Sequence, residues 1–178
     1  MEGIVDSSHT GLVAHAIAGN SAAFARLVEP YLPSALSSAR LILGGSGDAA
    51  NAVQDALISA WRDLPRLRKP QAFGAWFRQH VVRSAWRAAR RQRSQVRLPD
   101  GWIDPIDHLE RALASHQLQR AFEALEADDR VVLTLHYHLG LTNDETSRLL
   151  KVPVGTVKSR LHYALRRLRA AYDAEERT

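Results

Sequence analysis

Apolar residues recur three and four positions apart along the first part of the chain, the spacing that places them on one face of an α-helix. A first such stretch ends at Gly19, a second runs from Ala23 to Tyr31, and a third runs from Pro33 to Leu43. The run from Gly44 to Gly47 interrupts the pattern and indicates a loop. No stretch alternates apolar and polar residues as a strand does, so we expect an all-α protein.

Two longer helices are expected before the middle of the chain. Asp48 is suited to cap the N-terminus of the first, whose broad apolar face extends from Ala52 to Leu64. On this helix Trp61 is expected to belong to the core. The segment from Pro65 to Pro70 connects it to a second helix, which runs from Phe73 to about Arg93.

A break in the pattern divides the chain. Residues 97–107 hold two prolines, a glycine and three aspartates without periodicity. Apolar residues then recur at Leu109, Ala112 and Leu113 and on to Leu125, and a further helix from Asp128 to His138 is closed by Gly140. We therefore expect two small helical domains, over residues 10–95 and 109–174, joined by a flexible linker over residues 96–108.

The segment from Leu141 to Leu168 has the order of a helix-turn-helix. Thr142 and Glu145 match a capping box, in which each side chain bonds the backbone N–H of the other residue. Pro153 pushes the residue before it out of the helical region, which makes a turn before the second helix. The apolar residues expected to hold that helix against its partner are Val157, Leu161, Leu165 and Leu168.

The first turns of the second helix carry side chains that reach base edges and phosphates when a helix enters the major groove. Its later turns carry arginines that would follow the phosphate backbone and add affinity without sequence preference. An ordinary helical hairpin with a basic face fits the same pattern. The residues expected to contact duplex DNA are Thr156, Lys158, Ser159, Arg160, His162, Arg166 and Arg167.

Charge is distributed unevenly over this chain, whose net charge is +5. No Asp or Glu occurs from Leu64 to Pro99 or from Thr146 to Tyr172, and both segments are rich in Arg. The segment between them is acidic. Two basic blocks with an acidic spacer indicate two contacts with a polyanion. Arg-rich helices that serve only solubility give the same pattern.

Several kinds of chemistry lack their sequence signatures. The chain has no Cys, which excludes a disulfide framework and fits a reducing cytoplasm. It has no apolar run of membrane-spanning length, no signal segment and no nucleophile elbow. The loop from Gly44 to Gly47 lacks the Lys of a phosphate-binding loop, and His136 and His138 cannot share a helical face. We therefore expect a cytoplasmic protein without enzymatic activity, metal, cofactor or membrane insertion.

Three motifs carry a family resemblance. The helix-turn-helix contains the string Val154-Gly-Thr-Val-Lys-Ser-Arg-Leu161, which is its most specific part. Before it come Asp48-Ala with Val53-Gln54-Asp55 and Ala60-Trp61, and then Phe73-Gly-Ala-Trp76-Phe77 with the Arg-rich run. In this order, over about residues 11–169, the motifs resemble those of the extracytoplasmic-function (ECF) sigma factors of bacterial RNA polymerase.

The resemblance implies a transcription initiation factor that binds RNA polymerase core and directs it to promoters. Its helix-turn-helix would read the −35 element as duplex DNA, and its basic helix would recognise and open the −10 element. Polymerase core and promoter DNA are the implied partners, and an anti-sigma factor is a further candidate. The implied polymerase-binding residues are Asp48, Asn51, Gln54 and Asp55. The implied −10 residues are Trp76, Arg83, Trp86, Arg87, Arg90 and Arg91.

Several positions depart from the family pattern. Ala50 and Asn51 stand where acidic residues are common in the polymerase-binding helix, and Arg83 stands where the melting helix often has Asn. Thr146 occupies a position where a bulkier aliphatic residue is usual. Lys151 replaces the turn glycine, which costs about 1 kcal/mol if its backbone is left-handed.

Two other functions fit parts of the sequence. A helix-turn-helix regulator that works without polymerase would have the same DNA-binding half, and a palindromic site with a stable homodimer would favour it. A helical nucleic-acid enzyme could use the Arg and His surface, although the sequence offers no carboxylate or His cluster for catalysis.

Overall fold

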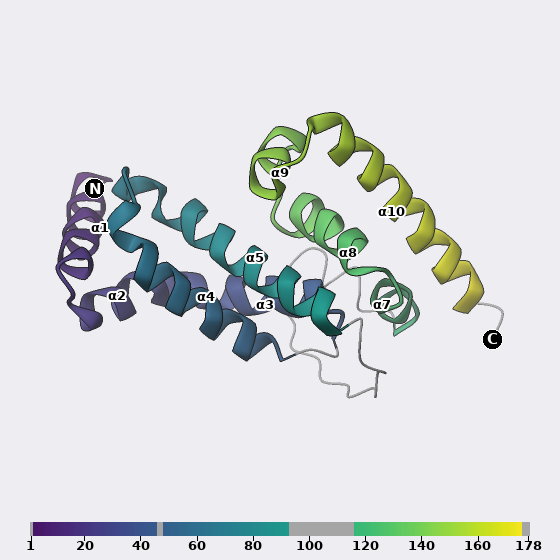
Figure 1. Cartoon of the computed structure of the whole chain (residues 1–178), viewed down its shortest axis with the longest axis horizontal. Helices are drawn as coiled ribbons and strands as arrows, with labels where there is room; N and C mark the ends of the chain where they lie inside the picture. Colours follow the sequence, from purple (N-terminus) through teal and green to yellow (C-terminus); the bar gives the residue numbers. More distant parts are fainter. Residues whose placement is uncertain (1, 46–47, 93–115, 176–178) are drawn as a thin grey trace.

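The computed structural model describes residues 2–45, 48–92 and 116–175, and over these residues every regular element is a helix. The helices form two groups, one before and one after the gap between residues 92 and 116 (Figure 1). The predicted linker over residues 96–108 lies outside the described residues, as do Leu109, Ala112 and Leu113.

The N-terminal group is built around α5, which packs against both α3 and α4. Asn20 caps α2, because its Oδ1 accepts from the N–H of Ala23 at 3.0 Å. Asp48 caps α4 through the N–H of Asn51 at 2.9 Å, as the sequence predicts. The described helices are α1 (Glu2–Ile17), α2 (Ser21–Val28), α3 (Leu32–Leu43), α4 (Ala49–Asp63) and α5 (Phe73–Gln92).

Prolines account for three short 3-10 turns between these helices. The turns are η1 (Glu29–Tyr31), η2 (Leu64–Arg66) and η3 (Pro70–Ala72), and each has a proline in its first two positions. A proline there loses no helical hydrogen bond, and its fixed φ suits the turn. The predicted connector between α4 and α5 therefore begins and ends in helical turns.

Aromatic residues at the start of α5 anchor the core of this group. Phe73 and Phe77 are fully buried, and their rings stack with centroids 5.9 Å apart. Tyr31 lies against both rings, at 5.7 and 6.3 Å. A Cβ added at Gly74 would lie 2.7 Å from the Tyr31 ring, so the close approach of η1 to α5 needs a glycine there.

The C-terminal group is organised by one long helix, α10, which packs against α7, α8 and α9. Gly140, at φ 62°, follows the helical segment that the sequence predicts to end there. The described elements are α7 (His116–Glu123), α8 (Ala127–Leu133), the π-helical turn η4 (Thr134–His138) that continues α8, α9 (Asn143–Leu150) and α10 (Val154–Glu175).

One predicted core position of α10 is wrong. Leu165 is 39% exposed, whereas Ala164 is fully buried in its place. The small Ala164 allows a close approach to the neighbouring helices, which turns the next residue outward. Val157 is buried, and Leu161 and Leu168 are partly buried, as predicted.

Helix α8 joins the two groups, because it lies against α3 and α5 of the N-terminal group (Figure 1). Buried apolar residues from both groups form one continuous cluster. The predicted all-α, two-domain fold is confirmed, although the sequence analysis did not predict that the domains touch. The predicted domain boundaries remain predictions.

Candidate nucleic-acid interface

The helix-turn-helix begins at a capping box. Thr142 Oγ1 accepts from the N–H of Glu145 at 3.2 Å, and Glu145 Oε2 accepts from the N–H of Thr142 at 2.8 Å. These hydrogen bonds, the backbone one above all, hold the pKa of the Glu145 carboxyl below its usual value. The start of α9 is thus fixed as the sequence predicts.

The turn between α9 and α10 is held by its own side chains. Lys151 adopts the left-handed conformation, with φ 57° and ψ 46°, so the expected cost of replacing glycine applies. Ser147 closes the turn, because its hydroxyl donates to Val152 O at 2.6 Å and its carbonyl accepts from the Val152 N–H at 3.2 Å. The two helices of the motif are therefore joined by a defined turn.

The first turns of α10 present a polar surface. Lys158, Ser159 and His162 are exposed, and Thr156 and Arg160 are half-buried. The Ser159 hydroxyl donates to Thr156 O at 3.0 Å, which occupies its proton within the helix. Contact of these five residues with duplex DNA remains a prediction.

Arg167 has a partner inside the protein. Its Nη1 donates to both carboxylate oxygens of Asp129, at 2.8 and 2.7 Å, and Asp129 has a side chain only 6% exposed. This hydrogen bond is the main reason that the pKa of Arg167 is raised. The structure thus shows Arg167 joining α10 to α8, a role that the sequence analysis did not assign to it. Arg166, the adjacent residue, is exposed.

Most of the predicted −10 residues share one side of α5. Neighbouring members of this set are three, four or seven residues apart, which places them on one side of a helix. We call this set the α5 face; it consists of Trp76, Arg83, Trp86, Arg87 and Arg90. Trp76 and Trp86 are half-buried, whereas Arg87 and Arg90 are exposed. Trp76 rests edge-on against His80, with centroids 4.4 Å apart. Aromatic side chains between cations suit single-stranded DNA.

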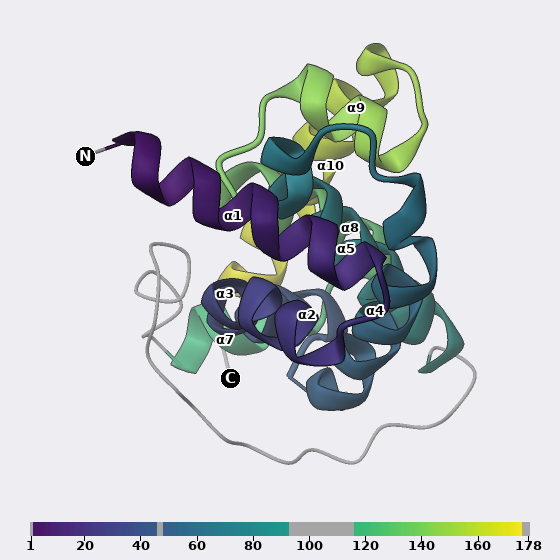
Figure 2. The same cartoon turned by 90° about the vertical axis from the view of Figure 1, so that its left-hand side faces the viewer.

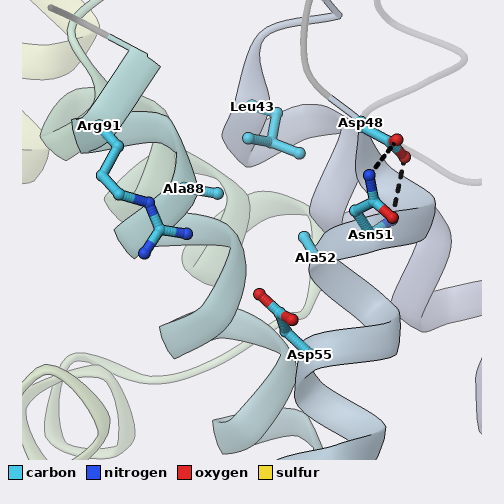
Figure 3. A pocket seen from close by; sticks show the side chains of 7 residues that line it. All are labelled: Leu43, Asp48, Asn51, Ala52, Asp55, Ala88 and Arg91. Atoms are coloured by element: carbon cyan, nitrogen blue, oxygen red, sulfur yellow. Dashed lines mark hydrogen bonds between the residues drawn. The ribbon is translucent and has the colours of Figure 1, made fainter.

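Arg91, four residues after Arg87, is the remaining predicted −10 residue. It lines a cavity of about 260 Å³ between the ends of α3, α4 and α5, together with Asp48, Asn51 and Asp55 (Figure 3). Figure 3 shows Arg91 and Asp55 on opposite sides of this cavity. The structure therefore places Arg91 beside the predicted polymerase-binding residues, and its contact with the −10 element remains a prediction.

His80 is a link between α5 and α4. Its Nδ1 lies 2.9 Å from the Ser59 hydroxyl. Burial lowers the pKa of His80, Arg83 and Arg87 lower it further, and Asp63 opposes them in part. The imidazole is therefore favoured in its neutral form.

The exposed side of α4 extends beyond the predicted polymerase-binding residues. Asn51, Gln54 and Asp55 are exposed, and the same side continues through Ile58, which is 51% exposed, and Trp61. The expectation that Trp61 belongs to the core is wrong, although its ring contacts that of Phe24 at 5.1 Å. In the sequence, Ile58 is an apolar residue that does not share the helical face of the other apolar residues of α4, and this could have identified it as an exposed apolar site. We call these five residues the α4 stripe.

The described residues were also inspected for other kinds of site. No helix among them is long and apolar enough to cross a membrane. In the same part of the chain, no three His, Asp or Glu side chains come together in a way that could hold a metal ion.

Comparison with known proteins matches both groups of helices. The family model described as Sigma-70 region 2 matches residues 27–95, and the model for Sigma-70 region 4 matches residues 115–168. The ECF RNA polymerase sigma factor SigM of Mycobacterium tuberculosis is 30% identical over 164 residues, which cover 92% of this chain and 84% of that protein. The chain belongs to the ECF sigma factors. It therefore acts with RNA polymerase in promoter-specific transcription initiation.

Other sigma factors agree with this membership. The ECF sigma-E factor of Escherichia coli K12 is 30% identical over 156 residues, covering 79% of this chain and 75% of that protein. The solved structure of CnrH in complex with the cytosolic domain of CnrY has a TM-score of 0.62 and 27% identity, covering 94% of this chain and 98% of CnrH. The sigma factor RpoE of Bartonella quintana, solved with the anti-sigma factor NepR, shares the fold, with a TM-score of 0.66 and 23% identity over 84% of this chain and 96% of RpoE.

The family membership confirms the predicted family, fold class and function. It disfavours the alternative of a helix-turn-helix regulator that works without polymerase. The residue assignments within the α4 stripe, the α5 face and α10 remain predictions.

Proposed function

We propose that this sigma factor divides initiation among three helices: α4 docks on polymerase core, α5 binds and opens the −10 element, and α10 reads the −35 duplex. The observation that carries the proposal is that the two regions matched by the sigma-70 models each present an exposed polar helix face. On α5 this face joins Trp76 and Trp86 to arginines, and on α10 it joins Lys158 to Arg160.

The sigma factor would open DNA without catalysis of its own. Unpaired bases that are captured on the α5 face shift the equilibrium between closed and open DNA toward the open form. Arginines bind the strand through its phosphates, and Trp76 and Trp86 offer surfaces on which bases can stack. The cytoplasm, where polymerase meets the chromosome, is the compartment in which this function would operate.

Apolar residues would strengthen docking through α4. Interfaces draw most of their binding energy from a few buried aromatic and aliphatic side chains surrounded by polar ones. Ile58 and Trp61 follow Asn51, Gln54 and Asp55 on the same side of the helix, so the α4 stripe has this composition. Arg91, across the cavity from Asp55, would contact the same partner.

An anti-sigma factor is proposed as a further partner. RpoE was solved with the anti-sigma factor NepR. CnrH, which covers 94% of the present chain, was solved with the cytosolic domain of CnrY. Coexpression with a candidate anti-sigma protein, followed by reconstitution, tests this proposal. A true anti-sigma factor should form a stoichiometric complex with this chain and abolish its run-off transcription.

Run-off transcription tests the central proposal. Genomic DNA fragments are transcribed by bacterial polymerase core with and without the purified factor, and new transcripts should start at discrete positions only when the factor is present. Asp55→Arg should weaken association with core, because it reverses a charge on the α4 stripe. Transcription that is independent of the factor, or equal core binding by wild type and folded Asp55→Arg, would contradict the proposal.

A further inference from the structure

His80 lies on the same side of α5 as the residues of the α5 face. It comes four residues after Trp76 and three residues before Arg83, so helical spacing places it between these two side chains. The members of the α5 face are Trp and Arg, whose side chains donate hydrogen bonds and accept none. The half-buried imidazole of His80 is the only side chain at these positions that can offer an acceptor. His80 therefore gives this side of α5 a hydrogen-bonding capacity that the α5 face lacks.

Helix α4 determines which ring nitrogen of His80 carries the proton. Figure 1 and Figure 2 both show α4 beside α5, and 2.9 Å separate Ser59 Oγ on α4 from His80 Nδ1. The Ser59 hydroxyl donates its single hydrogen to Ala56 O at 3.0 Å. The Ser59 oxygen is therefore left to accept from the Nδ1–H of His80. In the neutral imidazole this arrangement leaves a lone pair on Nε2.

The Nε2 lone pair of His80 is available to a ligand. Nε2 forms no hydrogen bond within the part of the chain that the structure describes, and it is not shielded from solvent. Burial lowers the pKa of His80, with Arg83 and Arg87 acting in the same direction and Asp63 against them, so the neutral ring prevails at neutral pH. A neutral imidazole accepts at its unprotonated nitrogen, whereas the protonated ring can only donate.

Trp76 is the tryptophan of the α5 face that lies next to this acceptor. The rings of Trp76 and His80 meet edge-on, with centroids 4.4 Å apart and 63° between their planes. Trp86, by contrast, donates through Nε1 to Asp128 Oδ1 of α8 at 2.8 Å, and the Arg90 guanidinium lies over its ring, 5.6 Å from the centroid. A base that stacks on Trp76 therefore brings its edge toward the imidazole, whereas the ring of Trp86 already has a cation against it.

We propose that His80 is a base-reading residue of this sigma factor: its Nε2 accepts a hydrogen bond from the exocyclic amino group of an unpaired base that stacks against Trp76. The inference rests on the proposed role of α5 in binding the −10 strand. Adenine and cytosine carry an amino group that donates, whereas thymine carries a carbonyl oxygen in its place. The site therefore favours an unpaired adenine or cytosine over a thymine.

An acceptor at this position also favours DNA that has already opened. In a duplex, the amino groups of adenine and cytosine donate to the partner base, and neighbouring base pairs cover both faces of each ring. An unpaired base offers its ring face to Trp76 and its amino group to His80. The two side chains therefore stabilise the open form selectively. The arginines of the α5 face attract phosphates without base preference, so His80 adds sequence preference to this surface.

Removal of one amino group from the DNA tests the proposal. The factor bound to polymerase core is titrated with labelled thymidine strands that carry either one central adenine or one central purine base, which is adenine without its amino group. Fluorescence anisotropy measures both affinities, and core alone is the reference. We expect the wild type to bind the adenine strand about fivefold more tightly than the purine strand, the gain from a single hydrogen bond. His80→Leu, which keeps an apolar side chain of similar size against Trp76, should bind the two strands alike.

A purely structural role for His80 gives a different result. Loss of packing would weaken binding to both strands equally and leave the ratio of their affinities unchanged. His80→Gln keeps an acceptor and should retain part of the difference, so the test remains decisive if the Leu variant fails to fold. Ser59→Ala keeps the imidazole but frees its tautomer, and should reduce the ratio. His15→Leu makes the same substitution at an exposed position on α1 and should keep the wild-type ratio.

The outcomes separate this inference from the function on which it rests. Equal binding of the adenine and purine strands by the wild type overturns the inference, as does a wild-type ratio in folded His80→Leu. A wild-type ratio in Ser59→Ala overturns the part of the inference that assigns the tautomer to Ser59. If the factor adds no strand binding to that of core alone, the proposed function of α5 is wrong, and the inference falls with it.

Discussion

The arginines of α10 differ in what already holds each side chain. Arg160 is half-buried, and its Nη1 is shielded from solvent without a hydrogen-bond partner among the described residues. Its side chain is therefore held against the domain near the start of the helix. Arg166 is exposed, and Arg167 is bound to Asp129. One helix thus supplies a candidate for base reading, a candidate for backbone contact and a structural ion pair.

Arg160→Ala and Arg166→Ala should separate base reading from backbone contact. Loss of a base contact by Arg160 should weaken binding to the −35 element by roughly 1–3 kcal/mol and spare a scrambled sequence. Loss of a phosphate contact by Arg166 should weaken binding to both DNAs equally and reduce the salt dependence. Titrations of both DNAs over several salt concentrations measure the difference. The same loss on both DNAs for both variants would disprove this division.

Arg167→Ala should affect folding rather than only DNA binding. The substitution leaves the nearly buried Asp129 carboxylate without the guanidinium that donates to both of its oxygens, so we expect it to lower the free energy of unfolding. Arg166→Ala removes the same charge from the adjacent position and serves as the control. Urea denaturation measures both, and identical stabilities would show that the ion pair contributes nothing.

At the scale of whole helices, local sequence signals predicted most of the secondary structure. Asp48 and Thr142 form the predicted caps, since capping depends on neighbours three residues away. Which residues of each helix are buried was harder to predict, because burial depends on the angles at which neighbouring helices cross. Leu165 shows this limit: periodicity placed it in the core, whereas tertiary packing turns it outward.

The α4 stripe makes a prediction about polymerase binding. Ile58→Ala should weaken association with core by roughly tenfold if Ile58 becomes buried at the interface, and should leave folding intact because the residue is exposed. Ile17→Ala truncates a side chain of the same type and similar exposure on α1. Core affinity is measured by competition between labelled wild type and each variant. If the two variants bind alike, the apolar part of the stripe is not in the interface.

The α5 face makes a prediction about DNA opening. Arg83 and Arg87 lie one turn apart on this face, on a part that Asp128 does not contact. Replacing both with Ala should reduce open-complex formation more than closed-complex binding, since the captured strand loses two cations. Permanganate reactivity of unpaired thymines measures opening, and mobility shift measures closed complexes. Unchanged permanganate footprints would argue against this use of the face.

At the scale of the whole molecule, the contact between domains had no signal in the sequence. Asp128 and Arg130 are ordinary charged residues of an amphipathic helix. The Trp86 indole that donates to Asp128 and the Ile42 carbonyl that accepts from Arg130 lie 42 and 88 positions away. A partner at that separation is set by tertiary folding, not by local pattern. The two domains and the helix-turn-helix were predictable because each rests on short-range periodicity, caps and turns.

We expect the contact between the domains, in which the Trp86 indole donates to Asp128, to open during assembly, because α5 and α10 are proposed to bind separate promoter elements. Spin labels attached to Ser21→Cys on α2 and Ala170→Cys on α10 report the distance between the domains, and both positions are exposed. The free factor should give one narrow distribution of distances, and addition of core with promoter DNA should shift it. The double variant must first support run-off transcription at the wild-type level. An unchanged distance in the transcribing complex would contradict the expected opening.

The π-helical turn η4 has a consequence for how this family can vary. A π turn accommodates one residue more than the α-helix around it, and here the N–H of Leu139 reaches back to Thr134 O at 3.0 Å. Deleting one residue from this turn would remove the residue that the π turn accommodates, so the segment beyond it would have to repack against α8. The orientation of α10 relative to α8 therefore depends on the number of residues in this turn as well as on side-chain packing. Thr134, Leu135 and His138 are buried, so the side chains of this turn are constrained as well as its length.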